Sequence, residues 1–213
     1  MTLSVPRCSK QWNVTGQEGL ESLKFSEQEL PELGDSQVLV KFCLSSRSEI
    51  RLTPFIKFRD VTIPRGEYPW DVKPNVVPGS DGAGTVLAVG KHVTRFKPGD
   101  KVITILSQVY LRGLVTDQIA KSGLGGGIDG TFRTVGAFNE QGLVAMPTAL
   151  TFVEAASLSC AGVTAWNALF RLSGKKVSAG QWVLTQGTGG VSIFAVQFAK
   201  AVGARVIVSQ EYP

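Results

Sequence analysis

The sequence feature that most constrains this fold is a glycine-rich turn near the C-terminal end of the chain. Residues 183–192 read Val-Leu-Thr-Gln-Gly-Thr-Gly-Gly-Val-Ser, and they join a predicted strand over 181–186 to a predicted helix over 193–202. A second predicted strand follows over 205–208. Strand, glycine-rich turn, helix and strand in this order predict a parallel βαβ unit. This is the context in which a G-x-G-x-x-G pattern binds a dinucleotide.

The turn residues have separate physical roles in such a site. A glycine at the strand exit allows the sharp turn, and the next two let the backbone approach a pyrophosphate, which faces the amides of the helix N-terminus. Serine stands where the pattern has its third glycine, so the fit is looser. The alternative, a structural turn without a ligand, stays open. The residues that we assign to cofactor binding here are Gly187, Thr188, Gly189, Gly190, Val191 and Ser192.

The end of the second strand indicates which nicotinamide cofactor is favoured. NAD sites place an acidic residue about 20 residues after the glycines, where it binds the ribose 2′-hydroxyl. Here the strand ends at Ser209, and the acid Glu211 comes two residues later. A neutral, hydroxyl-bearing end tolerates a 2′-phosphate. Ser209 is therefore a predicted cofactor contact, and NADP is favoured over NAD.

The first two thirds of the chain are rich in predicted strands. Apolar, β-branched runs over 38–42, 85–89, 101–106 and 131–146 are separated by Gly and Pro turns, which favours a small barrel or sandwich. The glycine-rich stretch 110–130 predicts an irregular insertion, either a lid over a site or a mobile surface loop. The character changes after Pro147, where Thr151 and Glu154 form a capping box. A further helix is predicted over 164–171. We expect domains over 1–150 and 151–213.

The helix over 193–202 has two further predicted features. Its apolar residues lie all round, which predicts burial on more than one side. Gly203 is a suitable residue to end it.

Composition excludes several classes of function. The 22 Lys and Arg against 17 Asp and Glu give a charge of +5, but the basic residues are spread along the chain, so we expect no nucleic-acid partner. No signal peptide and no run of about 18 apolar residues is seen, so we expect a cytoplasmic protein without a membrane partner. The three cysteines are far apart and form no zinc motif. The single histidine, His92, reads as a solvated turn residue.

These motifs together resemble the medium-chain dehydrogenase/reductase superfamily, and within it the zinc-free, quinone-oxidoreductase-like fungal branch that is often labelled zinc-type alcohol dehydrogenase-like. The matching segments are 76–84, 96–100, 158–169 and 187–192. The resemblance implies a mixed β and α/β fold, with a GroES-like β-barrel followed by an incomplete Rossmann domain. It also implies hydride transfer from NADPH to a carbonyl, quinone or activated alkene, with a role in secondary metabolism among fungal relatives.

The resemblance also bears on zinc and on single residues. Zinc-dependent members carry Cys near Ser48 and Gly-His-Glu at Gly79-Ser80-Asp81, so that Cys160 alone matches a ligand. One thiol does not hold a catalytic zinc, and we expect no metal site. Cys160 is expected to be a buried helix residue. Zinc-free relatives have Asn near Ser48 with an Arg-Asp pair after it, a pattern absent here. Thr164 matches the family position near the nicotinamide, and the catalytic residues stay unassigned.

The length raises an alternative function. After the glycine-rich turn the sequence supplies two predicted strands, whereas a complete Rossmann sheet has six, so we expect a C-terminally truncated domain. Both strands would keep unpaired apolar edges. Two functions therefore stay open: an oxidoreductase acting on a small-molecule substrate, or an inactive fragment that forms homo-oligomers or pairs through its open sheet edge.

Overall fold

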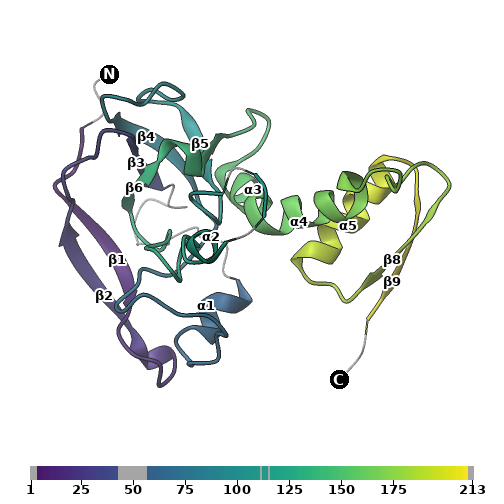
Figure 1. Cartoon of the computed structure of the whole chain (residues 1–213), viewed down its shortest axis with the longest axis horizontal. Coiled ribbons are helices and arrows are strands. Elements are labelled where there is room, and N and C mark those ends of the chain that lie inside the picture. The colour runs from purple at the N-terminus through teal and green to yellow at the C-terminus, as the bar shows by residue number, and fades with distance from the viewer. Residues whose placement is uncertain (1–3, 43–56, 111, 115, 211–213) are drawn as a thin grey trace. The chain divides into compact units, whose positions relative to one another are not determined.

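The computed structural model describes residues 4–42, 57–110, 112–114 and 116–210, which fall into two compact units (Figure 1). The first unit covers Met1–Ala156 and the second Ser157–Pro213. This division lies six residues after the expected boundary at 150. The reason is that Ala155 and Ala156, in α3 (Phe152–Ser157), are fully buried against residues of the first unit, Ala83 and Ile103 among them.

The first unit is built from antiparallel sheets. Its strands are β1 (Cys8–Val14), β2 (Leu23–Glu29), β3 (Gln37–Phe42), β4 (Ala83–Val89), β5 (Lys101–Thr104), β6 (Val135–Asn139) and β7 (Leu143–Ala145). Five of them form one sheet in the order β6-β3-β4-β5-β7, and β1 pairs with β2. The Trp12 amide donates to the Phe132 carbonyl at 3.0 Å, and the Thr134 amide donates to the Lys10 carbonyl at 2.8 Å. These bonds attach the β1–β2 pair to the chain that leads into β6.

Short helices connect these strands. They are η1 (Leu20–Ser22), α1 (Phe58–Thr62), α2 (Asp117–Ala120) and η2 (Glu140–Gly142). Helix α3 begins at the expected capping box, because the Glu154 amide donates to the Thr151 hydroxyl at 3.3 Å and the Glu154 carboxylate accepts from the Thr151 amide at 2.8 Å.

Strand β3 shows why the sheet is buried on both faces. Val38, Val40 and Phe42 point into the main core, while Leu39 packs on the opposite face with Leu87. This alternation is the two-residue period of a strand. The other buried residues of this main core are Val86, Phe96, Val102, Leu124, Phe138 and Leu143. The predicted strands over 38–42, 85–89 and 101–106 are confirmed with shifted ends. Strands β1 and β2 were not predicted.

The described residues of the glycine-rich stretch 110–130 include helix α2, and Leu124, in the second half of the stretch, is fully buried in the main core. A Cβ atom at Gly125 or Gly130 would collide with the backbone of Gly79. Residues 124–130 are therefore a packed part of the first unit and not a mobile surface loop, while the lid stays a prediction.

The second unit is a helical layer against two parallel strands. Its elements are η3 (Leu158–Gly162), α4 (Val163–Trp166), η4 (Asn167–Arg171), β8 (Trp182–Gln186), α5 (Gly190–Ala201) and β9 (Arg205–Ser209). Both η3 and η4 are π-helical, so the helix predicted over 164–171 is α-helical only in its first turn. Strands β8 and β9 pair in parallel from Trp182–Arg205 to Gln186–Ser209. The predicted βαβ unit is therefore confirmed.

Helix α5 departs from its expected burial. Among the residues that the structure describes, only Ala195 and Ala199 of this helix are buried, while Val191 and Ile193 are exposed. The expected burial on more than one side is confirmed only in part, because α5 packs against η3 and α4 and also against β8 and β9, while Val191 and Ile193 stay exposed. Its C-terminus is as predicted: Gly203 has φ +79°, and the Gly203 and Ala204 amides donate to the carbonyls of Lys200 and Ala199.

Within the part of the chain that the structure describes, no helix has the length and hydrophobicity needed to cross a membrane.

The packing of the glycine-rich stretch gives a first prediction. Leu124→Ala is expected to lower the free energy of unfolding by about 2–5 kcal/mol, because it leaves a cavity in the main core. Leu114→Ala, in the same stretch but 89% exposed, is the matched control and is expected to change it by less than about 0.5 kcal/mol. Urea unfolding followed by tryptophan fluorescence measures both. Equal effects would contradict the packing of this stretch.

Candidate functional site: the glycine-rich turn and a buried ion pair

The glycine-rich turn lies between the end of β8 and the start of α5. Gly187 has φ +76°, a left-handed conformation that glycine adopts without strain, and its amide donates to the Ser209 carbonyl at 2.6 Å. Gly189 caps the helix without a side-chain hydrogen bond, and its carbonyl accepts from the Ile193 amide at 3.0 Å. The first amides of α5 therefore have no intrahelical acceptor.

Space above the turn is open. No heavy atom lies within 4 Å of the position that a Cβ atom would take at Gly187 or at Gly189. At Gly190 a Cβ atom would meet the Ala161 side chain at 3.3 Å. Gly190 thus serves close packing between α5 and η3, whereas Gly187 and Gly189 leave the backbone accessible to a ligand.

The hydroxyl groups assigned to the site make local hydrogen bonds. Ser192 donates to the Gln186 carbonyl at 3.0 Å and thereby closes the turn. Ser209, at the end of β9, donates to the Thr185 carbonyl at 3.4 Å. Thr164 lies on α4 and donates to the Cys160 carbonyl at 2.7 Å. The structure brings residues 187–192 and Ser209 together at one end of the sheet, while Thr164 belongs to a separate helix.

A second cluster of polar groups is buried in the first unit. The Lys57 ammonium lies 2.7 Å from the Asp81 carboxylate, which is fully buried. The Ser80 hydroxyl donates to the same carboxylate at 3.0 Å. A buried carboxylate is costly unless it is paired and hydrogen-bonded, and these two contacts supply both.

Asp60 belongs to the same cluster. Its carboxylate accepts the amides of Lys57 at 2.8 Å and Gly79 at 3.2 Å. Burial raises the pKa of Asp60, and the nearby Asp81 carboxylate adds to the rise, while the two amides and the Arg59 guanidinium oppose it. Asp60 therefore joins α1 to the chain around Gly79.

The positions that bear on zinc are partly described. Ser48 lies outside the described residues. Ser80 and Asp81 bond to each other and to Lys57, and Cys160 is half-buried on η3 rather than fully buried as expected. The ring of His92 is exposed, as predicted, and lies 3.9 Å from Asp35. Within the described ranges, no three His, Cys, Asp or Glu side chains stand close enough to hold a metal ion.

Sequence reasoning missed the Lys57–Asp60–Asp81 cluster. Lys57 and Asp60 lie more than 20 residues before Asp81, and nothing in their local pattern indicates that they meet. The one local signal is the three-residue spacing of Lys57 and Asp60, which is that of a carboxylate capping a helix start.

Comparison with known proteins agrees with this arrangement. Residues 49–148 match the family model of the alcohol dehydrogenase GroES-like domain. A zinc-type alcohol dehydrogenase-like protein of Schizosaccharomyces pombe is 43% identical over 192 residues, which are 90% of this chain and 53% of that protein. This chain spans about half the length of the curated relatives that it matches.

Solved structures agree as well. The crystal structure of a putative alcohol dehydrogenase from Sinorhizobium meliloti 1021 superposes with a TM-score of 0.83 at 36% identity, over 96% of this chain and 57% of that one. A quinone oxidoreductase of Pseudomonas syringae gives a TM-score of 0.72 at 28% identity, over 96% and 54%.

A GroES-like sheet unit followed by a parallel βαβ unit with a glycine-rich turn defines the class of two-domain dehydrogenases and reductases. Residues 49–148 belong to the alcohol dehydrogenase GroES-like domain family, and the chain is similar to members of the medium-chain dehydrogenase/reductase superfamily. The expected fold, a mixed β and α/β architecture with a GroES-like domain and part of a Rossmann domain, is confirmed.

The buried ion pair gives a second prediction. Lys57→Met is expected to lower the free energy of unfolding by about 3–5 kcal/mol, because it leaves the Asp81 carboxylate buried and unpaired. The double variant Lys57→Met/Asp81→Leu removes both charges and is expected to cost less than the sum of the single variants.

The control is Lys73→Met, which breaks the more exposed pair with Asp129 and is expected to cost less than about 1 kcal/mol. Chemical denaturation of the four variants measures the coupling. Additive single effects would show that Lys57 and Asp81 do not act as a pair.

Proposed function

We propose that this protein is an NADPH-dependent oxidoreductase that transfers a hydride to a carbonyl, quinone or activated alkene without a catalytic zinc. The observation that carries this proposal is the open glycine-rich turn at the start of α5, a helix of 12 residues that follows a parallel strand. A helix N-terminus of this kind attracts a phosphate through its free amides and its dipole.

The residues of the turn fit the pyrophosphate of a dinucleotide. The missing side chains at Gly187 and Gly189 leave room for phosphate oxygens, and the hydroxyl of Ser192 is held back by the Gln186 carbonyl. The amides of Gly190 and Val191 are then the donors to the anion. Bound NADPH would supply the hydride, while the protein holds and orients it.

Residues outside the turn complete the proposed cofactor site. Ser209 ends β9 with a neutral side chain, which suits a ribose 2′-phosphate better than an acidic side chain would. Thr164 is proposed to face the nicotinamide half, by its match to the family position.

The zinc-free part of the proposal rests on the chemistry of the available donors. Where zinc-dependent members carry Gly-His-Glu, this chain has Ser80 and Asp81, and the carboxylate of Asp81 is already engaged by an ammonium. A serine hydroxyl and a neutralised carboxylate are a poor donor set for zinc, which takes cysteine, histidine and free carboxylates. We infer that the substrate is polarised by hydrogen bonds.

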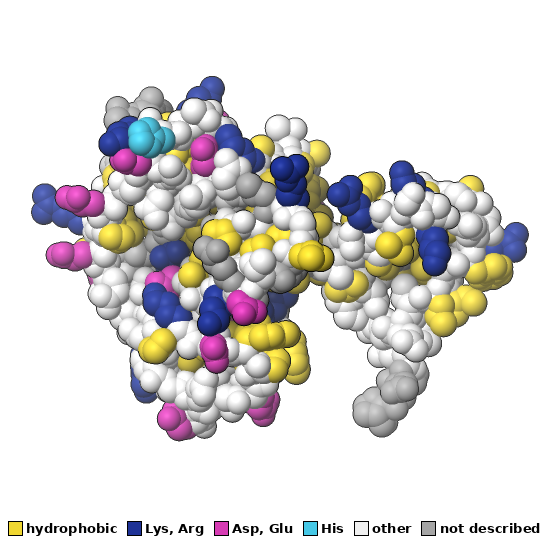
Figure 2. All heavy atoms as spheres, viewed as in Figure 1, with side chains coloured by type: hydrophobic (Ala, Val, Ile, Leu, Met, Phe, Trp, Pro, Cys, Tyr) yellow, Lys and Arg dark blue, Asp and Glu magenta, His cyan; other side chains and the backbone are white. Residues whose placement is uncertain are grey.

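The distribution of basic side chains bears on the partner of the protein. Figure 2 shows Lys and Arg side chains dispersed over the face in view, which supports a small-molecule substrate rather than a nucleic acid. We propose a cytoplasmic location without a membrane partner.

A second candidate is an interaction module without catalytic activity. Trp182 and Leu184 of β8 are each 63% exposed, and Ile207 and Val208 of β9 are also exposed. Figure 2 shows exposed apolar side chains on the second unit, at the right of the view. In a two-stranded sheet such side chains favour pairing with another chain, either a second copy or a full-length relative.

Cofactor binding separates the two candidates. NADPH is expected to quench tryptophan fluorescence with saturation in the micromolar range. Gly189→Ala is expected to weaken this binding at least tenfold, because the new methyl group enters the phosphate space, while φ −70° accepts alanine and leaves the fold intact.

Ser178→Ala is the control for this measurement. Ser178 is exposed and lies before β8, at the end of the strand opposite the glycine-rich turn, so the affinity for NADPH is expected to persist. No saturable response of the unmodified protein to millimolar NADPH would overturn the enzyme proposal for this chain and favour the interaction module.

The choice of cofactor gives a fourth prediction. Ser209→Asp is expected to weaken NADPH binding and strengthen NADH binding, because a carboxylate repels the 2′-phosphate and accepts from the 2′-hydroxyl. Ser209→Ala is the control and is expected to keep the order of preference. Parallel titrations with both nucleotides measure the ratio of the two dissociation constants. An unchanged ratio in Ser209→Asp would contradict the prediction that Ser209 lies beside the ribose that carries the 2′-phosphate.

A further inference from the structure

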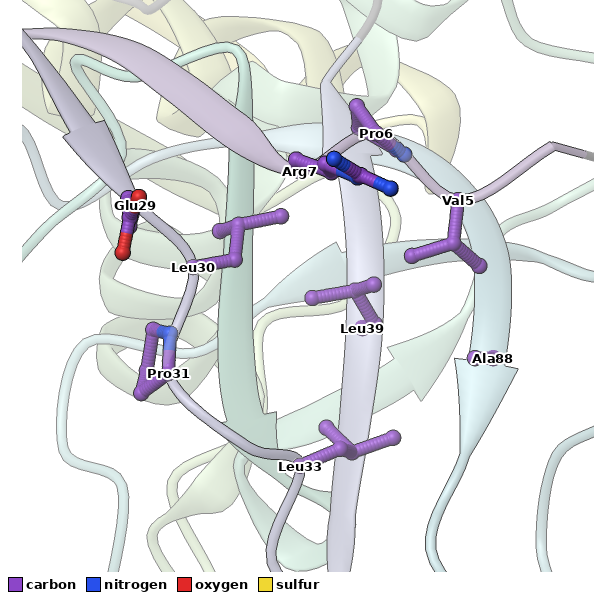
Figure 3. Close-up of a pocket in the computed structure, with 9 residues that line it drawn as sticks. All are labelled: Val5, Pro6, Arg7, Glu29, Leu30, Pro31, Leu33, Leu39 and Ala88. Carbon is purple, nitrogen blue, oxygen red and sulfur yellow. The ribbon is translucent and has the colours of Figure 1, made fainter.

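A pocket lined by apolar side chains and two charged ones lies on the first unit, on the face of the main sheet opposite the main core. Its volume is about 370 Å³, within the range of about 300–1,000 Å³ that small-molecule sites occupy. Figure 3 shows its lining residues around Leu39. The apolar side chains that line it include Val5, Leu30, Pro31, Leu33, Leu39 and Ala88.

The floor of the pocket is produced by an irregularity in β4. Leu39 pairs with Ala88, but the next residue, Val40, pairs with Val86, so Leu87 is an extra residue in the ladder. A bulge of this kind redirects side chains. Leu87 and Ala88 both join the cluster around Leu39, and the short side chain of Ala88 leaves space above it.

Two chain segments form the walls. The Leu30 amide donates to the Arg7 carbonyl at 2.9 Å, which fixes the segment before β1 beside the segment after β2. Pro6 and Pro31 lie next to this bond, one on each segment, and their rings restrict the backbone of both walls. The pocket is therefore preformed by the backbone.

Charge is distributed unevenly around the pocket. Arg7 is exposed, and Figure 3 shows it over Leu39, between Val5 and Leu30. Glu29 lies on the far side of Leu30 in the same view, at the other end of the lining. No salt bridge joins Arg7 to a carboxylate among the residues that the structure describes. An anionic group at Arg7 is favoured, whereas one at Glu29 is repelled.

We propose that this pocket binds a small anionic amphiphile, a monocarboxylate with a short hydrocarbon chain. The carboxylate would lie at Arg7 and the chain would cover Leu39 and Ala88. This site lies in the first unit and is independent of the proposed cofactor site, so its test does not depend on NADPH binding.

A chain-length series tests the apolar part of the proposal. Butyrate, hexanoate and octanoate are titrated into the ¹⁵N-labelled protein, and amide shifts of residues 5–7, 30–33 and 88 are followed by NMR. Each added methylene group is expected to tighten binding about fourfold until the pocket is filled. Shifts spread over the whole surface, or no dependence on chain length, would overturn the proposal.

Two variants test the position and the charge. Ala88→Phe fills the space above Leu39 and is expected to abolish octanoate binding, with a thermal melt to verify that the fold persists. Arg7→Gln is expected to weaken octanoate binding about two- to fivefold and leave octanol binding unchanged, as for an exposed ion pair.

Arg65→Gln, an exposed arginine outside the pocket, is the matched control and is expected to bind as the unmodified protein does. Octanol binding as tightly as octanoate in the unmodified protein would overturn the assignment of a carboxylate. Unchanged octanoate binding in Ala88→Phe would overturn the site.

Discussion

The backbone contact around Gly79 is the constraint on which the first unit depends. Residues 124–130 cross the loop before β4 so closely that a side chain at Gly125 or Gly130 would enter the Gly79 backbone. The Gly130 amide donates to the Val77 carbonyl at 2.6 Å, and the Gly79 amide donates to Asp60. Because backbone meets backbone here, Leu124 reaches the main core, and the bond from Gly79 to Asp60 holds α1 against the loop before β4.

The two units differ in how their polar groups are satisfied. In the first unit, polar groups are buried and satisfied by one another, as the Lys57–Asp81 pair shows. In the second unit, the turn around Gly187 leaves backbone amides open. A closed polar cluster gives stability and position, whereas an open row of amides gives a place for an anion. This difference supports the proposal that the second unit binds the cofactor and the first unit contributes to the substrate side.

Local patterns predicted the elements whose buried faces are apolar. Strand β3, the turn at Gly187 and the cap at Gly203 each have a short-range signal, and all are found in the structure. Strand β1 has no such signal, because its buried positions include Ser9, Gln11 and Asn13. Two of these polar side chains bond to distant residues: Ser9 donates to the Val135 carbonyl at 2.8 Å, and Asn13 donates to the Asn75 carbonyl at 2.9 Å. Gln11 donates to the Asn13 side chain on the same strand. A pattern of hydrophobicity does not reveal such a strand.

The sequence by itself determined the βαβ unit, its glycine-rich turn and the family resemblance, because these depend on residue types at fixed short spacings. Only the tertiary structure decided the rest of the site. The pairing of Lys57 with Asp81, the burial of Leu124 and the pocket above the bulge at Leu87 each join segments far apart in the chain. Such contacts depend on how strands and loops pack, and the spacing of residues along the sequence does not predict that packing.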